Sequence, residues 1–94
     1  MVEFEITATH KDNFNNTHEA ISKYRWVQYS TAKGDDTDRE IVVRWVEQGI
    51  RAYVSDRFGR KVYCSVRTSI RGVKFLQTYA DGYYTDNLLS LPTF

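Results

Sequence analysis

The sequence predicts an α+β domain: a mostly antiparallel sheet of about five strands, one helix packed on one face, and a short C-terminal helical turn. Three observations lead to this prediction. Several stretches alternate apolar and polar residues, as half-buried strands do. One stretch has a helical period after a capping sequence, and glycine-containing turns separate the later apolar stretches. The chain has 94 residues, enough for one hydrophobic core, so residues 1–94 are expected to form a single domain.

The first two strands are expected near the N-terminus. Residues 2–9 alternate Val, Phe, Ile and Ala with Glu and Thr, which is a period of two. Residues 20–30 (AISKYRWVQYS) are rich in the β-branched and aromatic residues that strands favour. Residues 11–17 (KDNFNNT) between them are typical of a turn. We therefore expect a hairpin with a loose loop.

One long helix is predicted from Thr37 to Gln48, after a loop at residues 31–36. Thr37 and Glu40 have the spacing of a capping box, in which each side chain bonds the backbone N–H of the other residue. Gly49 is suited to end the helix, because glycine adopts positive φ without strain. An apolar stripe that faces the sheet is expected from Ile41, Val42, Trp45 and Val46.

Three more strands are expected as an antiparallel meander. They cover residues 51–56, 61–68 and 73–80, separated by a Gly-containing hairpin loop and a short turn. Beyond them, Asp81-Gly82 favours a tight hairpin turn, and this loop lacks the alternating oxygen ligands of a calcium site.

The C-terminal stretch is expected to close the core. Asp86 is placed to cap one helical turn that Pro92 ends. The leucines at positions 88, 89 and 91 would then fold back over the sheet.

Charge is distributed unevenly along the chain. The formal net charge is +1, yet residues 51–74 hold seven basic residues and one acid, Asp56, so the remainder is net acidic. Strand alternation would place a set of cations and tyrosines on the exposed face of the meander, namely Arg51, Tyr53, Lys61, Tyr63 and Arg67, with Lys74 nearby. Such a face suits single-stranded nucleic acid, whose bases stack on rings. It is equally typical of the solvent-exposed face of an ordinary antiparallel sheet that binds no ligand.

The apolar tail supports a different function. Leu88, Leu91 and Phe94 must cover either the core of the chain itself or another protein surface. The function we favour is therefore a non-catalytic protein–protein interaction or self-associating module. Nucleic-acid binding is the alternative.

No group of residues predicts catalysis, a cofactor or a metal site. Cys64 is the single cysteine and has no base nearby in the sequence, so a buried core residue is expected. His10, Asp12 and His18 fall short of the four ligands of structural zinc. Because no convergent catalytic groups can be named, we expect a protein that is not an enzyme. The start of the chain lacks the long apolar run of a signal peptide or a membrane span, which predicts a cytoplasmic protein.

Two C-terminal segments carry a family resemblance. Residues 73–82 (VKFLQTYADG) and 85–92 (TDNLLSLP) resemble the signature of a small bacterial family, the domain of unknown function 3892. Residues 21–26, the acidic helix start with Glu40 and Trp45, and residues 52–54 ahead of Gly59 are also similar, so the resemblance covers nearly the whole chain. It implies a bacterial or phage-associated cytoplasmic protein, and it implies no activity.

Overall fold

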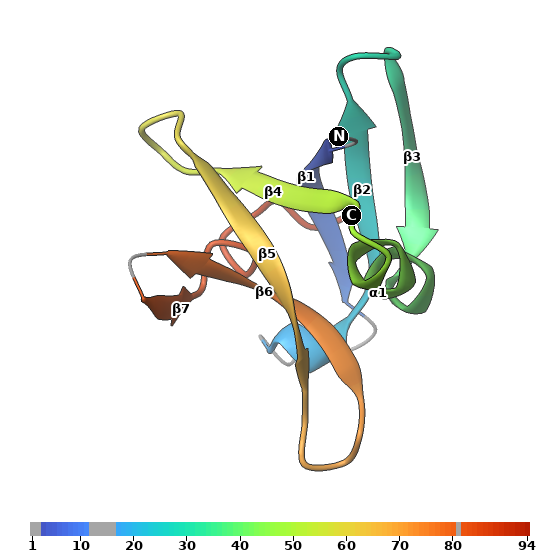
Figure 1. Ribbon diagram of the computed structural model, residues 1–94, viewed down its shortest axis with the longest axis vertical. Helices are drawn as coiled ribbons and strands as arrows, with labels where there is room; N and C mark the ends of the chain where they lie inside the picture. The colour runs from blue at the N-terminus through green and yellow to red at the C-terminus, as the bar shows by residue number, and fades with distance from the viewer. Residues whose placement is uncertain (1–2, 12–16, 81) are drawn as a thin grey trace.

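The computed structural model describes residues 3–11, 17–80 and 82–94 (Figure 1). In chain order its elements are β1 (Glu3–Lys11), the short 3-10 helix η1 (His18–Ala20), β2 (Ile21–Gln28), β3 (Lys33–Asp38), α1 (Arg39–Glu47), β4 (Arg51–Ser55), β5 (Lys61–Thr68), β6 (Lys74–Ala80) and β7 (Tyr83–Thr85).

The fold class predicted from the sequence is wrong. The described residues form a mixed seven-stranded sheet in the order β3-β2-β1-β4-β5-β6-β7, with one short helix, so the protein is mostly β. The predicted hairpin β1–β2 and the meander β4–β5–β6 are present as antiparallel pairs. The strands β1 and β4 pair in parallel. Sequence patterns indicate pairing between consecutive strands joined by short turns, so they did not predict this pair of strands far apart in the chain.

Two strands were missed because their sequences carry weak β signals. Residues 33–38 (KGDDTD) contain no apolar residue, yet β3 pairs with β2 along its whole length. Cross-strand contacts stabilise this pairing, because Arg25 forms an ion pair with Asp36 at 2.8 Å and Trp26 donates to Thr37. Strand formation depends strongly on such neighbours, and less on intrinsic propensity. The other missed strand, β7, has only three residues.

The helix α1 begins two residues later than predicted. Thr37 belongs to β3, and the N-cap residue Asp38 makes no side-chain capping bond, so the predicted capping box is wrong. The predicted stop is correct: Gly49 has φ of 101°, and its N–H donates to the carbonyl of Val46 at 3.1 Å. The N–H of Ile50 donates to the carbonyl of Trp45 at 3.0 Å, which completes a Schellman motif.

The expected C-terminal helical turn is also wrong, since residues 86–91 form hydrogen-bonded turns and no helix. Asp86 accepts from the N–H groups of Leu89 and Ser90 through its backbone carbonyl, at 3.0 and 3.2 Å. A segment this short gains too few helical bonds to offset the cost of nucleation. The leucines do close the core, as predicted. Leu88 is fully buried, and the partly buried Leu89 and Leu91 pack against the core.

One face of the sheet packs on both α1 and the C-terminal segment. The core contains Val42 and Val43 of α1 with Leu88, packed against strand residues that include Phe4, Ile6, Ile21, Tyr24, Ala52, Val54 and Leu76. The tail then returns to β1, where Thr9 donates to the Pro92 carbonyl and Phe94 donates to the Thr9 carbonyl, each at 3.0 Å. The last residues of the chain thus pair with its first strand.

Candidate functional site: a groove between two hairpins

Only some of the cations and tyrosines that the sequence placed on one sheet face lie together in the structure. Four of its members, Arg51, Tyr53, Lys61 and Tyr63, gather around Glu3 on the sheet face opposite α1, and we call these five residues the outer cluster. Arg67 lies further along β5, where it donates to Gln77 at 2.8 Å and covers the Tyr84 ring at 4.2 Å. Lys74 is on the helix side of the sheet and pairs with Glu47 at 2.7 Å.

Glu3 of β1 offsets part of the positive charge of the outer cluster. Glu3 accepts from the Lys61 ammonium at 2.5 Å and from the Tyr63 hydroxyl at 3.1 Å. The Lys61 contact holds the pKa of Glu3 below its usual value, and the same contact raises the pKa of Lys61. Tyr53 is only 5% exposed, and Lys61 lies over its ring at 4.7 Å, so little of this ring is open to a ligand.

The apolar tail is largely used within the chain. Leu88 is 0% exposed and belongs to the core, while Phe94 lies beneath the Arg25 guanidinium at 4.2 Å. Of the three tail residues expected at an interface, Leu91 lines an open cavity.

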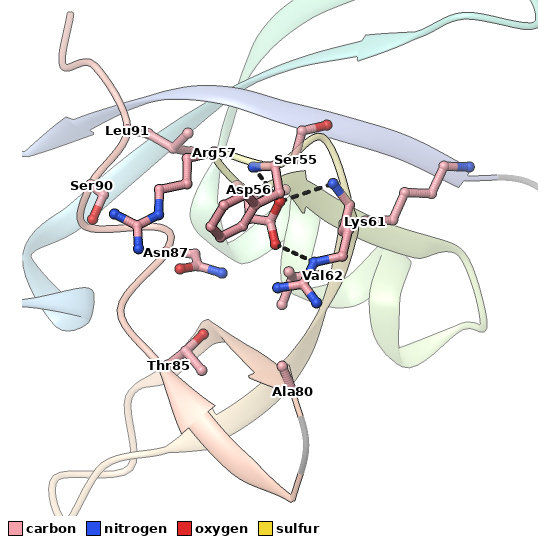
Figure 2. A pocket seen from close by; sticks show the side chains of 13 residues that line it. Ser55, Asp56, Arg57, Lys61, Val62, Ala80, Thr85, Asn87, Ser90 and Leu91 are labelled. Carbon is pink, nitrogen blue, oxygen red and sulfur yellow. Dashed lines mark hydrogen bonds and ion pairs between the residues drawn. The ribbon is translucent and has the colours of Figure 1, made fainter.

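That cavity is a groove of about 690 Å³ (Figure 2). Its upper wall is the hairpin joining β4 and β5, with residues 54–58 and 60–62. Its lower wall is formed by Ala80 and Thr85 of the β6–β7 hairpin together with Asn87, Ser90 and Leu91 of the C-terminal segment. We call it the hairpin groove.

Asp56 organises the tip of the β4–β5 hairpin. One carboxylate oxygen accepts from the backbone N–H groups of Phe58 and Arg60, both at 2.9 Å, and the other accepts from the Arg60 side chain at 3.0 Å (Figure 2). These bonds hold the pKa of Asp56 below its ordinary value, the Arg60 N–H contributing most. The tip is therefore a preformed wall of the groove.

Phe58 projects from this tip between two guanidinium groups. The ring is 69% exposed, with the central carbons of Arg57 and Arg60 at 5.0 and 5.5 Å from its centroid. Tyr83, 75% exposed, pairs with Ala80 across the β6–β7 hairpin, so both side chains lie on the groove side of that hairpin. The groove thus has aromatic side chains on both rims.

The base of the groove is apolar and its upper rim is cationic. Val54, Val62 and Leu91 supply the apolar surface. The cations Arg57, Arg60 and Lys61 all come from the β4–β5 hairpin. Sequence reasoning missed Arg57, Phe58 and Asn87, because the hairpin tip looks like an ordinary turn and Asn87 is distant in the chain. The one available signal was an aromatic residue flanked by arginines in a turn.

The residues that sequence reasoning considered for nucleophilic or metal chemistry are Cys64 and the His, Cys, Asp and Glu side chains. Desolvation raises the pKa of the Cys64 thiol to about 12, which leaves almost no thiolate at neutral pH. Across residues 3–11, 17–80 and 82–94, no three His, Cys, Asp or Glu side chains are grouped to hold a metal ion. Asp12 and Asp81 lie outside these residues.

The geometry defines a class: a small, mostly β domain with an open groove between two hairpins. The sequence profile of the family described as "Protein of unknown function (DUF3892)" matches residues 5–92. The chain therefore belongs to this family, as the C-terminal segments predicted. No curated protein matches the chain, and neither does any solved structure. No helix among the described residues is long and apolar enough to cross a membrane.

Proposed function

We propose that this domain is a non-catalytic interaction module that binds a segment of a partner protein in the hairpin groove. One observation carries the proposal. Two of the large exposed apolar side chains among the described residues, Phe58 and Tyr83, lie on the groove side of the two hairpins that flank it, one on each hairpin. Exposed aromatic residues next to arginine are the composition of protein-binding surfaces.

The shape of the groove supports a peptide-like ligand. A volume of about 690 Å³ is in the range that holds a short segment or a drug-sized molecule. Its apolar base can accept side chains of Leu or Val size, while the hairpin tips remain in water. The partner would thus contact Leu91, one of the residues that the sequence marked for an interface.

Selection from a random twelve-residue peptide display library would test this function. We expect enriched peptides to shift the amide resonances of residues 54–62 and 80–91 of the labelled protein. The double variant Phe58→Ser/Tyr83→Ser should weaken these peptides about tenfold, since aromatic anchors dominate such interfaces. Ile70→Ser is the matched control, because Ile70 is another exposed large apolar residue and lies away from the groove in the β5–β6 turn.

Two results would count against the module. One is a library in which no peptide is enriched over background. The other is a set of peptides that bind the double variant and Ile70→Ser equally well, because their site would then lie outside the groove.

Single-stranded nucleic acid is the second candidate ligand, favoured by the cations over tyrosine rings in the outer cluster. The evidence for nucleic-acid binding is weaker, because Lys61 and Tyr63 already donate hydrogen bonds to Glu3. Titration with a ten-nucleotide oligothymidine at low and moderate salt would decide. Salt-sensitive shifts at Arg51, Tyr63 and Arg67 would support nucleic-acid binding, and their absence at low salt would remove it.

A further inference from the structure

Among the residues that the structure describes, one of the three cations on the groove wall has no acidic partner. Arg60 pairs with Asp56 at 3.0 Å, and Lys61 pairs with Glu3 at 2.5 Å. Arg57 makes no ion pair or hydrogen bond to any other residue that the structure describes; its contact is with the Phe58 ring. Within residues 3–11, 17–80 and 82–94, the groove therefore presents one unpaired cation, Arg57.

A second unsatisfied donor faces Arg57 from the opposite wall. In Figure 2 the Arg57 side chain extends over the C-terminal segment, toward Asn87 and Ser90. Asn87 is half-buried, and its side-chain amide has no hydrogen-bond partner within residues 3–11, 17–80 and 82–94. Ser90 already donates to the Asp86 carbonyl, so Asn87 is the stronger candidate to serve a ligand.

We infer that Arg57 and Asn87 form a carboxylate subsite, which receives an aspartate or glutamate side chain of the partner segment. This inference rests on the proposed function and specifies its ligand. A guanidinium presents two parallel N–H groups in a plane, the geometry that matches a carboxylate. The Asn87 amide adds an N–H donor from the other wall.

The charge balance favours a carboxylate over a phosphate. A phosphoryl group carries nearly two negative charges and is usually bound by a cluster of free cations. Here the neighbouring cations are already paired, and one guanidinium balances one carboxylate. The apolar base at Val54, Val62 and Leu91 would then hold the residues next to the acid, so the partner segment combines acidic and aliphatic residues.

Three blocked hexapeptides test this inference by titration into the labelled protein. Their sequences are Ser-Leu-Glu-Leu-Glu-Ser, the same peptide with glutamine for glutamate, and the same peptide with phosphoserine for glutamate. We expect the glutamate peptide to bind in the groove about tenfold more tightly than the glutamine peptide. Arg57→Gln should remove that difference, and so should raised salt. Arg71→Gln, at an exposed arginine of the β5–β6 turn, should leave it unchanged.

The contrary outcomes separate this inference from the proposed function. Equal groove binding of the glutamate and glutamine peptides overturns the subsite and leaves the module intact. Phosphoserine binding that exceeds glutamate binding and requires Arg57 also overturns it, in favour of a phosphate site. If library-selected peptides bind elsewhere and none of the three shifts groove resonances, both proposals fail.

Discussion

Thr37 shows how one tertiary contact can change the role of a residue. Its position before Asp38, Arg39 and Glu40 favours a helix cap, and its hydroxyl is chemically suited to that role. In the structure the hydroxyl instead accepts from the Trp26 indole, with 2.9 Å between nitrogen and oxygen. Trp26 packs against Phe4 and Trp45, so its N–H is half-buried and needs a partner.

Replacing Thr37 with valine should test the importance of this bond. Valine keeps the branched shape but leaves the indole N–H without an acceptor, so we expect a loss of about 1 kcal/mol in the free energy of unfolding. Thr37→Ser, which keeps the hydroxyl, should lose much less. Urea unfolding followed by tryptophan fluorescence would measure both. A valine variant as stable as the parent would mean that this bond contributes nothing.

His18 should make stability depend on pH. Its ring is buried against Phe75, with centroids 6.1 Å apart, and desolvation lowers its pKa below the ordinary 6.5. Asp86 opposes this shift, while Arg67 and Lys11 add to it. Because the unfolded chain then binds the proton more readily, the stability is complete above about pH 6.5 and decreases as the pH falls toward the folded pKa.

Chemical denaturation between pH 7.5 and 5 would reveal this effect. The parent should lose stability across that range, whereas His18→Phe should lose less, because phenylalanine keeps the stacked ring and cannot be protonated. If the free energy of unfolding fell equally with pH in the parent and in His18→Phe, the pH dependence would not come from His18, and the prediction would be wrong.

At the scale of elements, the end of α1 follows from local chemistry alone. Gly49 has φ of 101°, a conformation that L-residues rarely adopt, and an added Cβ would meet no atom within 4 Å. A substitution there is thus penalised by the backbone conformation and not by a clash.

Gly49→Ala should lower the free energy of unfolding by about 1 kcal/mol. Gln48→Ala is the matched control, because Gln48 is exposed and has negative φ (φ −84°, ψ −1°), which alanine adopts without strain, and it should be close to neutral. Thermal unfolding of the two variants side by side would measure the difference. Equal stability would show that the turn can adopt another conformation.

The two edge strands differ in how open they are to another chain. β3 carries Asp35, Asp36 and Asp38, and charges along an edge discourage unwanted strand pairing. β7 carries Tyr83 and Tyr84 and no charge. Figure 1 places these edges on opposite sides of the molecule, with β7 on the same side as the β4–β5 hairpin that bounds the groove. The side of the molecule that we propose for binding is thus the one whose edge strand carries no charged residue.

At the scale of the whole molecule, the tail joins the two ends of the chain. Residues 92–94 form two backbone hydrogen bonds with Thr9, and Phe94 stacks beneath Arg25. We therefore expect the tail to stabilise its own domain.

Removal of residues 92–94 should cost about 2 kcal/mol of folding stability, from two backbone hydrogen bonds and one cation–π contact. Light scattering coupled to size exclusion should give the same mass for the truncated and full-length proteins. A lower mass after truncation would instead identify the tail as an interface between copies.

The candidate site illustrates the limit of sequence reasoning. The uneven charge is plain in residues 51–74, but the groups that neutralise it, Glu3 and Glu47, are distant in the chain. Arg57 stands out as unpaired only after these pairings are known. Asn87 joins it because the C-terminal segment packs beneath the β4–β5 hairpin.

By itself the sequence determined the first hairpin, the meander, the helix stop at Gly49 and the family, since each depends on residues close together in the chain. Only the tertiary structure decided the mixed seven-stranded sheet, the pairing of β3 with β2, the return of the tail to β1, and the hairpin groove. These features depend on backbone pairing and packing between segments far apart in the chain. Such contacts can override local propensity, as they do for Thr37 and for β3, whose sequence KGDDTD lacks the residues that strands favour.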